Sequence, residues 1–155
     1  MKLRLFAAAL IFSVLSALAQ TTVVKNHRAV GRIICTDTLD TPAVKMLQKF
    51  ASRITGAHIP LVVSNAKPAK GDIVIRRTDN PAIAEDGFRI DSRPGWLTIE
   101  STRGNGSLYG VISLLERYAG CNYWSENDFT APQASSLTIP AVDFIDNPAF
   151  RHRPT

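Results

Sequence analysis

The sequence predicts an α/β (α+β) fold, a two-layer sandwich in which a mixed β-sheet carries two helices on one face. Two segments, residues 42–55 and 108–118, have the apolar spacing of amphipathic helices. Seven short stretches around them are rich in β-branched residues or alternate apolar with polar side chains, as half-buried strands do. Because each helix has a single apolar stripe, both are most simply buried against the same face of the sheet.

The first half of the predicted domain contains two strands and one helix. The strands are short β-prone runs at residues 21–24 and 32–35. Thr41 suits the N-cap of the helix, and Pro42 suits its first position because the missing N–H of proline would be unpaired there anyway. Gly56 can adopt the left-handed conformation that commonly ends a helix. We therefore expect a helix over residues 42–55.

The second half contains four strands, a helix and a last strand. The four strands are expected at residues 59–63, 72–76, 87–91 and 96–100. Turn residues at 92–95 predict that the last two of these strands pair as an antiparallel hairpin. A glycine-containing turn at 102–107 leads into the helix over residues 108–118, and a final short strand is expected at 137–139.

The N-terminus has the features of an export signal. Lys2 and Arg4 precede an apolar run at residues 5–18, and Ala17-Leu18-Ala19 places small residues where a signal peptidase reads. This run of 14 residues is shorter than the roughly 20 that a membrane span needs. We therefore expect residues 1–19 to be a signal peptide, the mature protein to be periplasmic or secreted, and no membrane contact to remain after cleavage.

Size and charge exclude several classes of protein. The chain has 155 residues and a formal net charge of +5; without residues 1–19 it keeps 136 residues, 16 basic against 13 acidic, a charge of +3. That charge attracts a polyanion only weakly, so a nucleic-acid partner is not expected. The mature length fits one domain and is too short for a complete barrel enzyme of about 250 residues.

No catalytic or metal-binding constellation emerges from the residues. The three histidines are scattered and no His or Cys pair has ligand spacing, so we expect neither a metal nor a cofactor. Glu85 and Asp86 are adjacent and would point in opposite directions on a strand, which makes them a poor pair for glycoside hydrolysis. Cys35 and Cys121 form either a disulfide, as exported proteins allow, or two buried free thiols.

Three aromatic residues follow the second predicted helix. Tyr123 and Trp124 are adjacent, and Phe129 comes five residues later. Exposed aromatic rings can stack on sugars, which makes Tyr123 and Trp124 candidate substrate-binding residues. The alternative is that the cluster covers the core or fills an interface with a neighbouring domain.

The ordered set of these segments resembles a known accessory domain. Residues 96–100 (WLTIE), the turn GNGS at 104–107 and the helix start LYG at 108–110 carry the resemblance, and residues 118–124 (YAGCNYW) extend it. The chain is similar over about residues 30–153 to the N-terminal accessory domain of bacterial glycoside hydrolases. Family 67 α-glucuronidases and family 20 β-hexosaminidases have such a domain before a catalytic barrel.

The resemblance implies a division of labour between domains. It implies that residues 20–145 are a non-catalytic accessory domain, that residues 146–155 form a junction, and that catalysis belongs to a downstream barrel. Hexosaminidases carry P-x-F-x-x-R-G in the first barrel strand, where the Arg holds sugar hydroxyls. Arg153 matches that Arg, although Pro154 replaces the Gly, so Arg153 is a further candidate substrate-binding residue.

Two functions from different classes remain open at this point. The first is the accessory domain of an exported glycoside hydrolase acting on a polysaccharide or glycan, which stabilises the barrel that follows it. The second is a free-standing periplasmic module that binds carbohydrate or another partner. In both cases no catalytic residue is expected within the chain.

Overall fold

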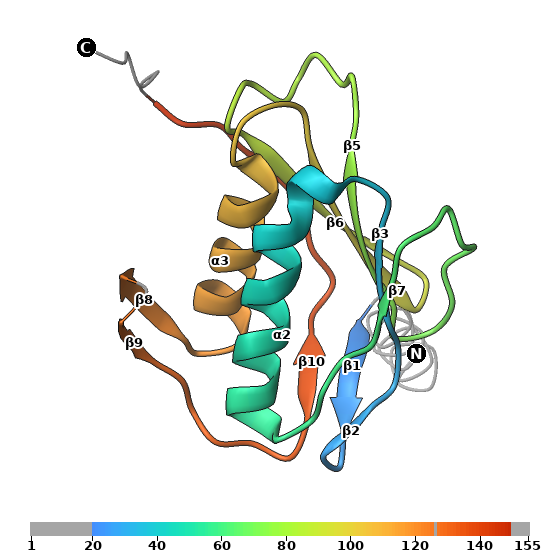
Figure 1. The fold of residues 1–155 in the computed structure, drawn as a ribbon, viewed down its shortest axis with the longest axis vertical. Helices are drawn as coiled ribbons and strands as arrows, with labels where there is room; N and C mark the ends of the chain where they lie inside the picture. Colours follow the sequence, from blue (N-terminus) through green and yellow to red (C-terminus); the bar gives the residue numbers. More distant parts are fainter. Residues whose placement is uncertain (1–19, 126, 150–155) are drawn as a thin grey trace, which may run out of the picture.

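The computed structural model describes residues 20–125 and 127–149. Helices α2 (Thr41–Thr55) and α3 (Gly106–Tyr118) lie side by side on one face of a six-stranded mixed sheet (Figure 1). The predicted two-layer α/β arrangement is therefore confirmed. The predicted signal peptide at residues 1–19 lies outside the described residues, and among the residues described no helix is long and apolar enough to cross a membrane.

The six-stranded sheet has the order β11-β6-β7-β5-β3-β4. Its strands are β3 (Ile33–Cys35), β4 (Leu61–Val62), β5 (Ile73–Arg77), β6 (Phe88–Arg93), β7 (Trp96–Ser101) and β11 (Asp143–Asp146). Strands β4, β3, β5 and β7 run parallel to one another. Strand β6 forms the predicted antiparallel hairpin with β7, and β11 is antiparallel to β6. The sheet is mixed, as the sequence predicts.

The core lies between this sheet and the two helices. The helices bury apolar stripes that include Leu47, Phe50 and Ile54 on α2 and Val111, Leu114 and Leu115 on α3. They pack on the isoleucines and leucine at the centre of the sheet, namely Ile33, Ile73, Ile75, Ile90, Leu97 and Ile99. Gly110 allows α3 to approach closely, because a Cβ there would lie 2.8 Å from a side-chain carbon of Ile99.

The start of α2 differs from the sequence prediction. Thr41 is the first helical residue and not the N-cap, because the chain enters the helix through a 3₁₀ turn, η1 (Thr38–Asp40). Asp37 caps that turn by accepting a hydrogen bond from the Leu39 N–H at 2.9 Å. The predicted end of the helix is confirmed: Gly56 has φ 72° and its N–H donates to the Ser52 carbonyl at 2.7 Å.

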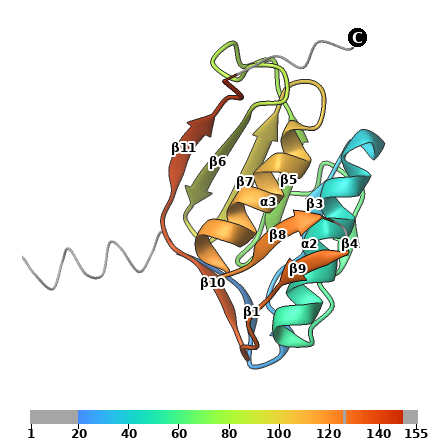
Figure 2. The same ribbon diagram turned by 90° about the vertical axis from the view of Figure 1, so that its left-hand side faces the viewer.

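Two smaller sheets complete the fold. Strands β1 (Thr21–Lys25), β2 (Arg28–Ala29) and β10 (Leu137–Ile139) form an antiparallel sheet of order β10-β1-β2. Strands β8 (Asn122–Ser125) and β9 (Asp128–Thr130) form a hairpin that lies on the outer side of the helices, away from the large sheet (Figure 2). The predicted strand at 59–63 shortens to two residues in the structure.

Candidate functional site

The β8–β9 hairpin separates the three aromatic residues into two groups. Tyr123 and Phe129 are half-buried and face α2, with ring centroids 6.3 and 4.9 Å from that of Phe50. Trp124 lies where the register of the hairpin shifts, between the pairs made by Tyr123 and Ser125, and 63% of its surface is exposed. The structure therefore brings Tyr123 and Phe129 together and leaves Trp124 at the surface.

An open groove lies between the N-terminal halves of the two helices. Its volume is about 420 Å³. Four apolar side chains line it together with two lysines on its rim, and these six residues define the interhelical groove: Pro42, Met46, Leu108, Tyr123, Lys45 and Lys49. The Nζ atom of Lys49 lies 4.8 Å from the centre of the Phe129 ring. Aliphatic and aromatic walls with a charged rim are typical of surfaces that bind another protein.

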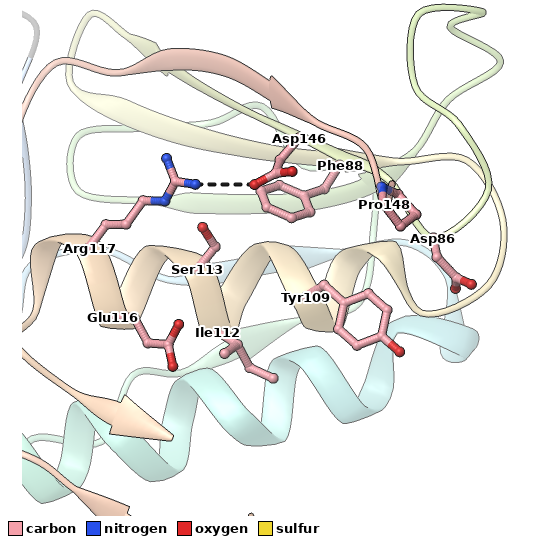
Figure 3. A pocket seen from close by; sticks show the side chains of 9 residues that line it. All are labelled: Asp86, Phe88, Tyr109, Ile112, Ser113, Glu116, Arg117, Asp146 and Pro148. Carbon is pink, nitrogen blue, oxygen red and sulfur yellow. Dashed lines mark hydrogen bonds and ion pairs between the residues drawn. The ribbon is translucent and has the colours of Figure 1, made fainter. Parts of the chain in front are cut away.

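A second pocket lies between α3 and the edge strand β11 (Figure 3). We name it the α3–β11 pocket; its volume is about 340 Å³. It combines an apolar wall of Phe88, Tyr109 and Ile112 with charged groups, namely Asp86, Glu116, Arg117 and Asp146. Arg117 Nη2 donates to Asp146 Oδ2 at 3.1 Å, and the same guanidinium lies 4.5 Å from the centre of the Phe144 ring.

A buried polar network occupies the carboxyl ends of the parallel strands. Asp40 is fully buried; its Oδ1 accepts hydrogen bonds from Arg77 Nη2 at 3.0 Å and from Ser107 Oγ at 2.7 Å. Arg77 ends β5 and also donates to the carbonyls of Thr102 and Gly104 at 3.3 Å. Ligands of open α/β sheets commonly bind at this edge. Here Asp40 directly precedes α2, and its buried carboxylate contacts Ser107 in the first turn of α3.

No pattern in the sequence predicts this network. Asp40 and Arg77 are 37 positions apart, and Asp40 and Ser107 are 67 apart. Each residue alone is ordinary in a loop or at the end of a strand. Only the parallel pairing of β3, β5 and β7 brings their ends to the same edge.

The two cysteines are free, buried thiols, so the disulfide between Cys35 and Cys121 considered from the sequence is not formed. Cys35 Sγ donates to the Asp37 carbonyl at 3.3 Å. Burial raises the pKa of Cys121 to about 11, and the nearby charge of Glu116 acts in the same direction. Burial also raises the pKa of Cys35. Both thiols are therefore protonated at neutral pH, the form that does not act as a nucleophile.

The adjacent residues Glu85 and Asp86 line separate hollows of the described chain. Asp86 lines the α3–β11 pocket, whereas Glu85 lines a different hollow beside Arg103. Within residues 20–125 and 127–149, no group of three or more His, Cys, Asp or Glu side chains could hold a metal ion. Arg153 lies outside the described residues, so its role, like that of Tyr123 and Trp124 in binding a sugar, stays a prediction.

The fold and these sites define a two-layer α/β domain with open surface grooves beside its two helices. The sequence matches glycosyl hydrolase family 20, domain 2, over residues 15–141, and the chain belongs to this family of domains. This confirms the resemblance to the accessory domain of bacterial glycoside hydrolases. No curated protein matches the sequence at a significant level.

Solved structures share the fold at low sequence identity. The family 20 β-N-acetylhexosaminidase from Streptomyces coelicolor is 20% identical with a TM-score of 0.61, over 85% of this chain and 24% of that one. The family 20 exo-β-N-acetylglucosaminidase from Vibrio harveyi is 18% identical with a TM-score of 0.58, over 86% of this chain and 18% of that one. The present chain thus spans a quarter or less of their length.

A glycosidase of another family has a similar domain. A family 115 4-O-methyl-α-glucuronidase with specificity for decorated arabinogalactans is 13% identical with a TM-score of 0.54, over 81% of this chain and 18% of that one. The fold is therefore shared by family 20 hexosaminidases and by a glucuronidase, which belongs to family 115 and not to the family 67 named in the sequence resemblance.

Proposed function

We propose that this chain is the non-catalytic accessory domain of an exported glycoside hydrolase and that it packs against a catalytic barrel and stabilises it. The family match and the short span of the related chains support a role within a larger enzyme. Export is supported by the basic and apolar character of residues 1–19. One structural observation supports a docking role most directly: the two faces of the domain differ in what they offer to a partner.

The outer face of the large sheet satisfies its own charges. Arg76 on β5 pairs with Glu100 on β7, and Arg89 on β6 pairs with Asp143 on β11 at 3.0 Å. Register places Arg76 and Arg89 on either side of Glu100, opposite the isoleucines that face the helices. Arg93 pairs with Asp91 at 2.5 Å. Among the described residues, these three arginines on the outer face each pair with a carboxylate of the same face.

The helix layer offers apolar surface to a partner. The interhelical groove is open, and two aromatic side chains, Tyr109 on α3 and Trp124 on β8, are 44% and 63% exposed. Aromatic residues are enriched at protein interfaces because they bury a large area at low entropic cost. The barrel would therefore dock on the helices and the β8–β9 hairpin.

Reading the gene beyond the codon for Thr155 tests whether a barrel follows. An open frame with repeated βα periodicity supports the proposal, and a stop codon at that point contradicts the barrel.

Met46→Lys then tests the docking face in the longer protein, with Arg76→Gln on the outer sheet face as the control. We expect Met46→Lys to lower the melting temperature of the longer protein more than that of residues 20–155. An equal loss in both would contradict docking at the groove.

We also propose a second candidate function, a free-standing carbohydrate-binding module. The exposed ring of Trp124 supports it, because sugars stack on accessible aromatic faces. Calorimetric titration of residues 20–155 with soluble polysaccharides tests this function. Trp124→Ala is the variant that lacks the exposed aromatic ring. Absence of heat at millimolar sugar would rule it out.

A further inference from the structure

Near the end of the described residues, the chain is hydrogen-bonded to a neighbouring loop. Asn147 follows β11, and its side chain holds a neighbouring loop with two hydrogen bonds: Oδ1 accepts from the Ala84 N–H at 2.8 Å and Nδ2 donates to the Ala82 carbonyl at 3.0 Å. Gly87 makes room for this contact, since a Cβ there would lie 2.2 Å from Asn147 Oδ1. The next residue, Pro148, lines the α3–β11 pocket (Figure 3).

The α3–β11 pocket has an excess of negative charge. Asp86, Glu116 and Asp146 line it, and the one guanidinium among its lining residues, that of Arg117, already pairs with Asp146. Asp86 Oδ1 accepts the Asn105 N–H at 2.6 Å. A carboxylate has capacity for several hydrogen bonds, so Asp86 can accept another donor at its second oxygen.

We propose that this pocket binds the segment that directly continues the chain, residues 150–155, through an ion pair between Arg151 and Asp86. The segment has the complementary charge, since Arg151, His152 and Arg153 follow one another. Arg151 is three residues beyond Pro148, a distance of up to about 10 Å along an extended chain, and its long side chain adds to that reach.

The apolar wall of the pocket suits the residue before Arg151. Tyr109 and Ile112 line the side of the pocket formed by α3. In the proposed contact the Phe150 ring packs against this wall, which removes apolar surface from water on both sides. The order Phe150-Arg151 in the chain thus matches a pocket in which an apolar wall lies beside the carboxylate of Asp86.

The contact would fix the direction in which a following domain is attached. This consequence rests on the proposed function, whereas the contact itself involves only residues of this chain. The test below therefore uses this chain alone, so that the ion pair can fail while the accessory role stands, and the reverse.

A double-mutant cycle with Asp86→Asn and Arg151→Gln tests the ion pair. Asn keeps an acceptor for the Asn105 N–H and tolerates the positive φ of 61° at position 86. We expect the two changes to be non-additive, with a coupling of roughly two- to fivefold in the unfolding equilibrium constant. High salt should reduce this coupling. The Arg151 amide signal in NMR should also shift in Asp86→Asn.

Two matched variants serve as controls. Glu85→Gln removes the neighbouring charge, which lines a different pocket, and Arg153→Gln removes a charge from the same segment. Neither should couple with the Asp86–Arg151 pair. No coupling between Asp86 and Arg151, or an equal coupling of Arg151 with Glu85, would overturn the proposal.

Discussion

Asp72 is a buried carboxylate that joins two loops to the start of β5. It accepts hydrogen bonds from the Arg32 N–H at 2.7 Å, from Arg32 Nη2 at 2.8 Å and from the Ala69 N–H at 2.9 Å. Burial acts to raise the pKa of Asp72, but the hydrogen bonds from Arg32 and from the two backbone N–H groups outweigh it. The pKa consequently lies below its ordinary value of 3.8.

The lowered pKa predicts a pH dependence of stability. Ionised Asp72 stabilises the folded state above its unfolded pKa of about 3.9, and this contribution is lost as the pH falls through the lower folded value. Asp72→Asn should reduce the free energy of unfolding by about 1–3 kcal/mol at pH 7, with a smaller difference near pH 3. Urea unfolding between pH 3 and pH 7 measures this difference in the free energy of unfolding. Asp79→Asn, at an exposed position, is the control. A difference that stays constant with pH would contradict the assignment.

The network around Asp40 predicts a second residue-scale effect. Ser107→Ala removes the donor 2.7 Å from Asp40 Oδ1, and Oδ2 of the same carboxylate has no hydrogen-bond partner among the described residues. Leaving a buried carboxylate with fewer donors should destabilise the domain by about 1–3 kcal/mol in chemical denaturation. Ser113→Ala on the same helix is the control and should change stability by less than about 0.5 kcal/mol. Equal losses would contradict the role of Asp40.

At the scale of elements, the C-terminal end of α2 is held by residues far away in the sequence. His27 Nδ1 donates to the Thr55 carbonyl at 2.8 Å, and Gln133 Nε2 donates to the Arg53 carbonyl at 2.9 Å. The Ala134 N–H donates to the Ile54 carbonyl at 2.9 Å. These donors satisfy carbonyls that a helix end otherwise leaves without partners.

Shortening His27 should loosen this end of the helix. His27→Asn keeps a residue that tolerates the φ of 62° but cannot reach the Thr55 carbonyl. We expect a loss of about 0.5–1.5 kcal/mol and faster amide hydrogen exchange in the last turn of α2. Exchange at the first turn of α2 is the internal reference. Uniform acceleration along the whole helix would contradict a local effect.

Periodicity predicted the elements that it governs directly. Both helices and strands β5, β6 and β7 follow from apolar spacing, because each presents one face to a single core. Strand β11 has no such signal in Asp143-Phe144-Ile145-Asp146, and it is a strand because it pairs with β6. The same reason applies to the Asp40–Arg77–Ser107 network, whose members meet only through the topology of the sheet.

At the scale of the whole molecule, the exposed helix layer predicts self-association of the isolated domain. Trp124 and the interhelical groove leave apolar surface in water, which favours contact between copies. Light scattering at high concentration should detect oligomers, and Trp124→Ser should reduce them without changing the fold. Val63→Ser, which removes an exposed side chain near β4, is the control. A monodisperse monomer would contradict the prediction.

Strand β1 pairs with β10, so the first strand of the described chain is completed by one of the last, and β11 closes the far edge of the large sheet. Thr21 can therefore pair with Ile139 only when both ends of the domain are available. The domain cannot finish folding piece by piece from its N-terminus. A chain that becomes available from its N-terminus onward completes this domain only once β10 and β11 are present.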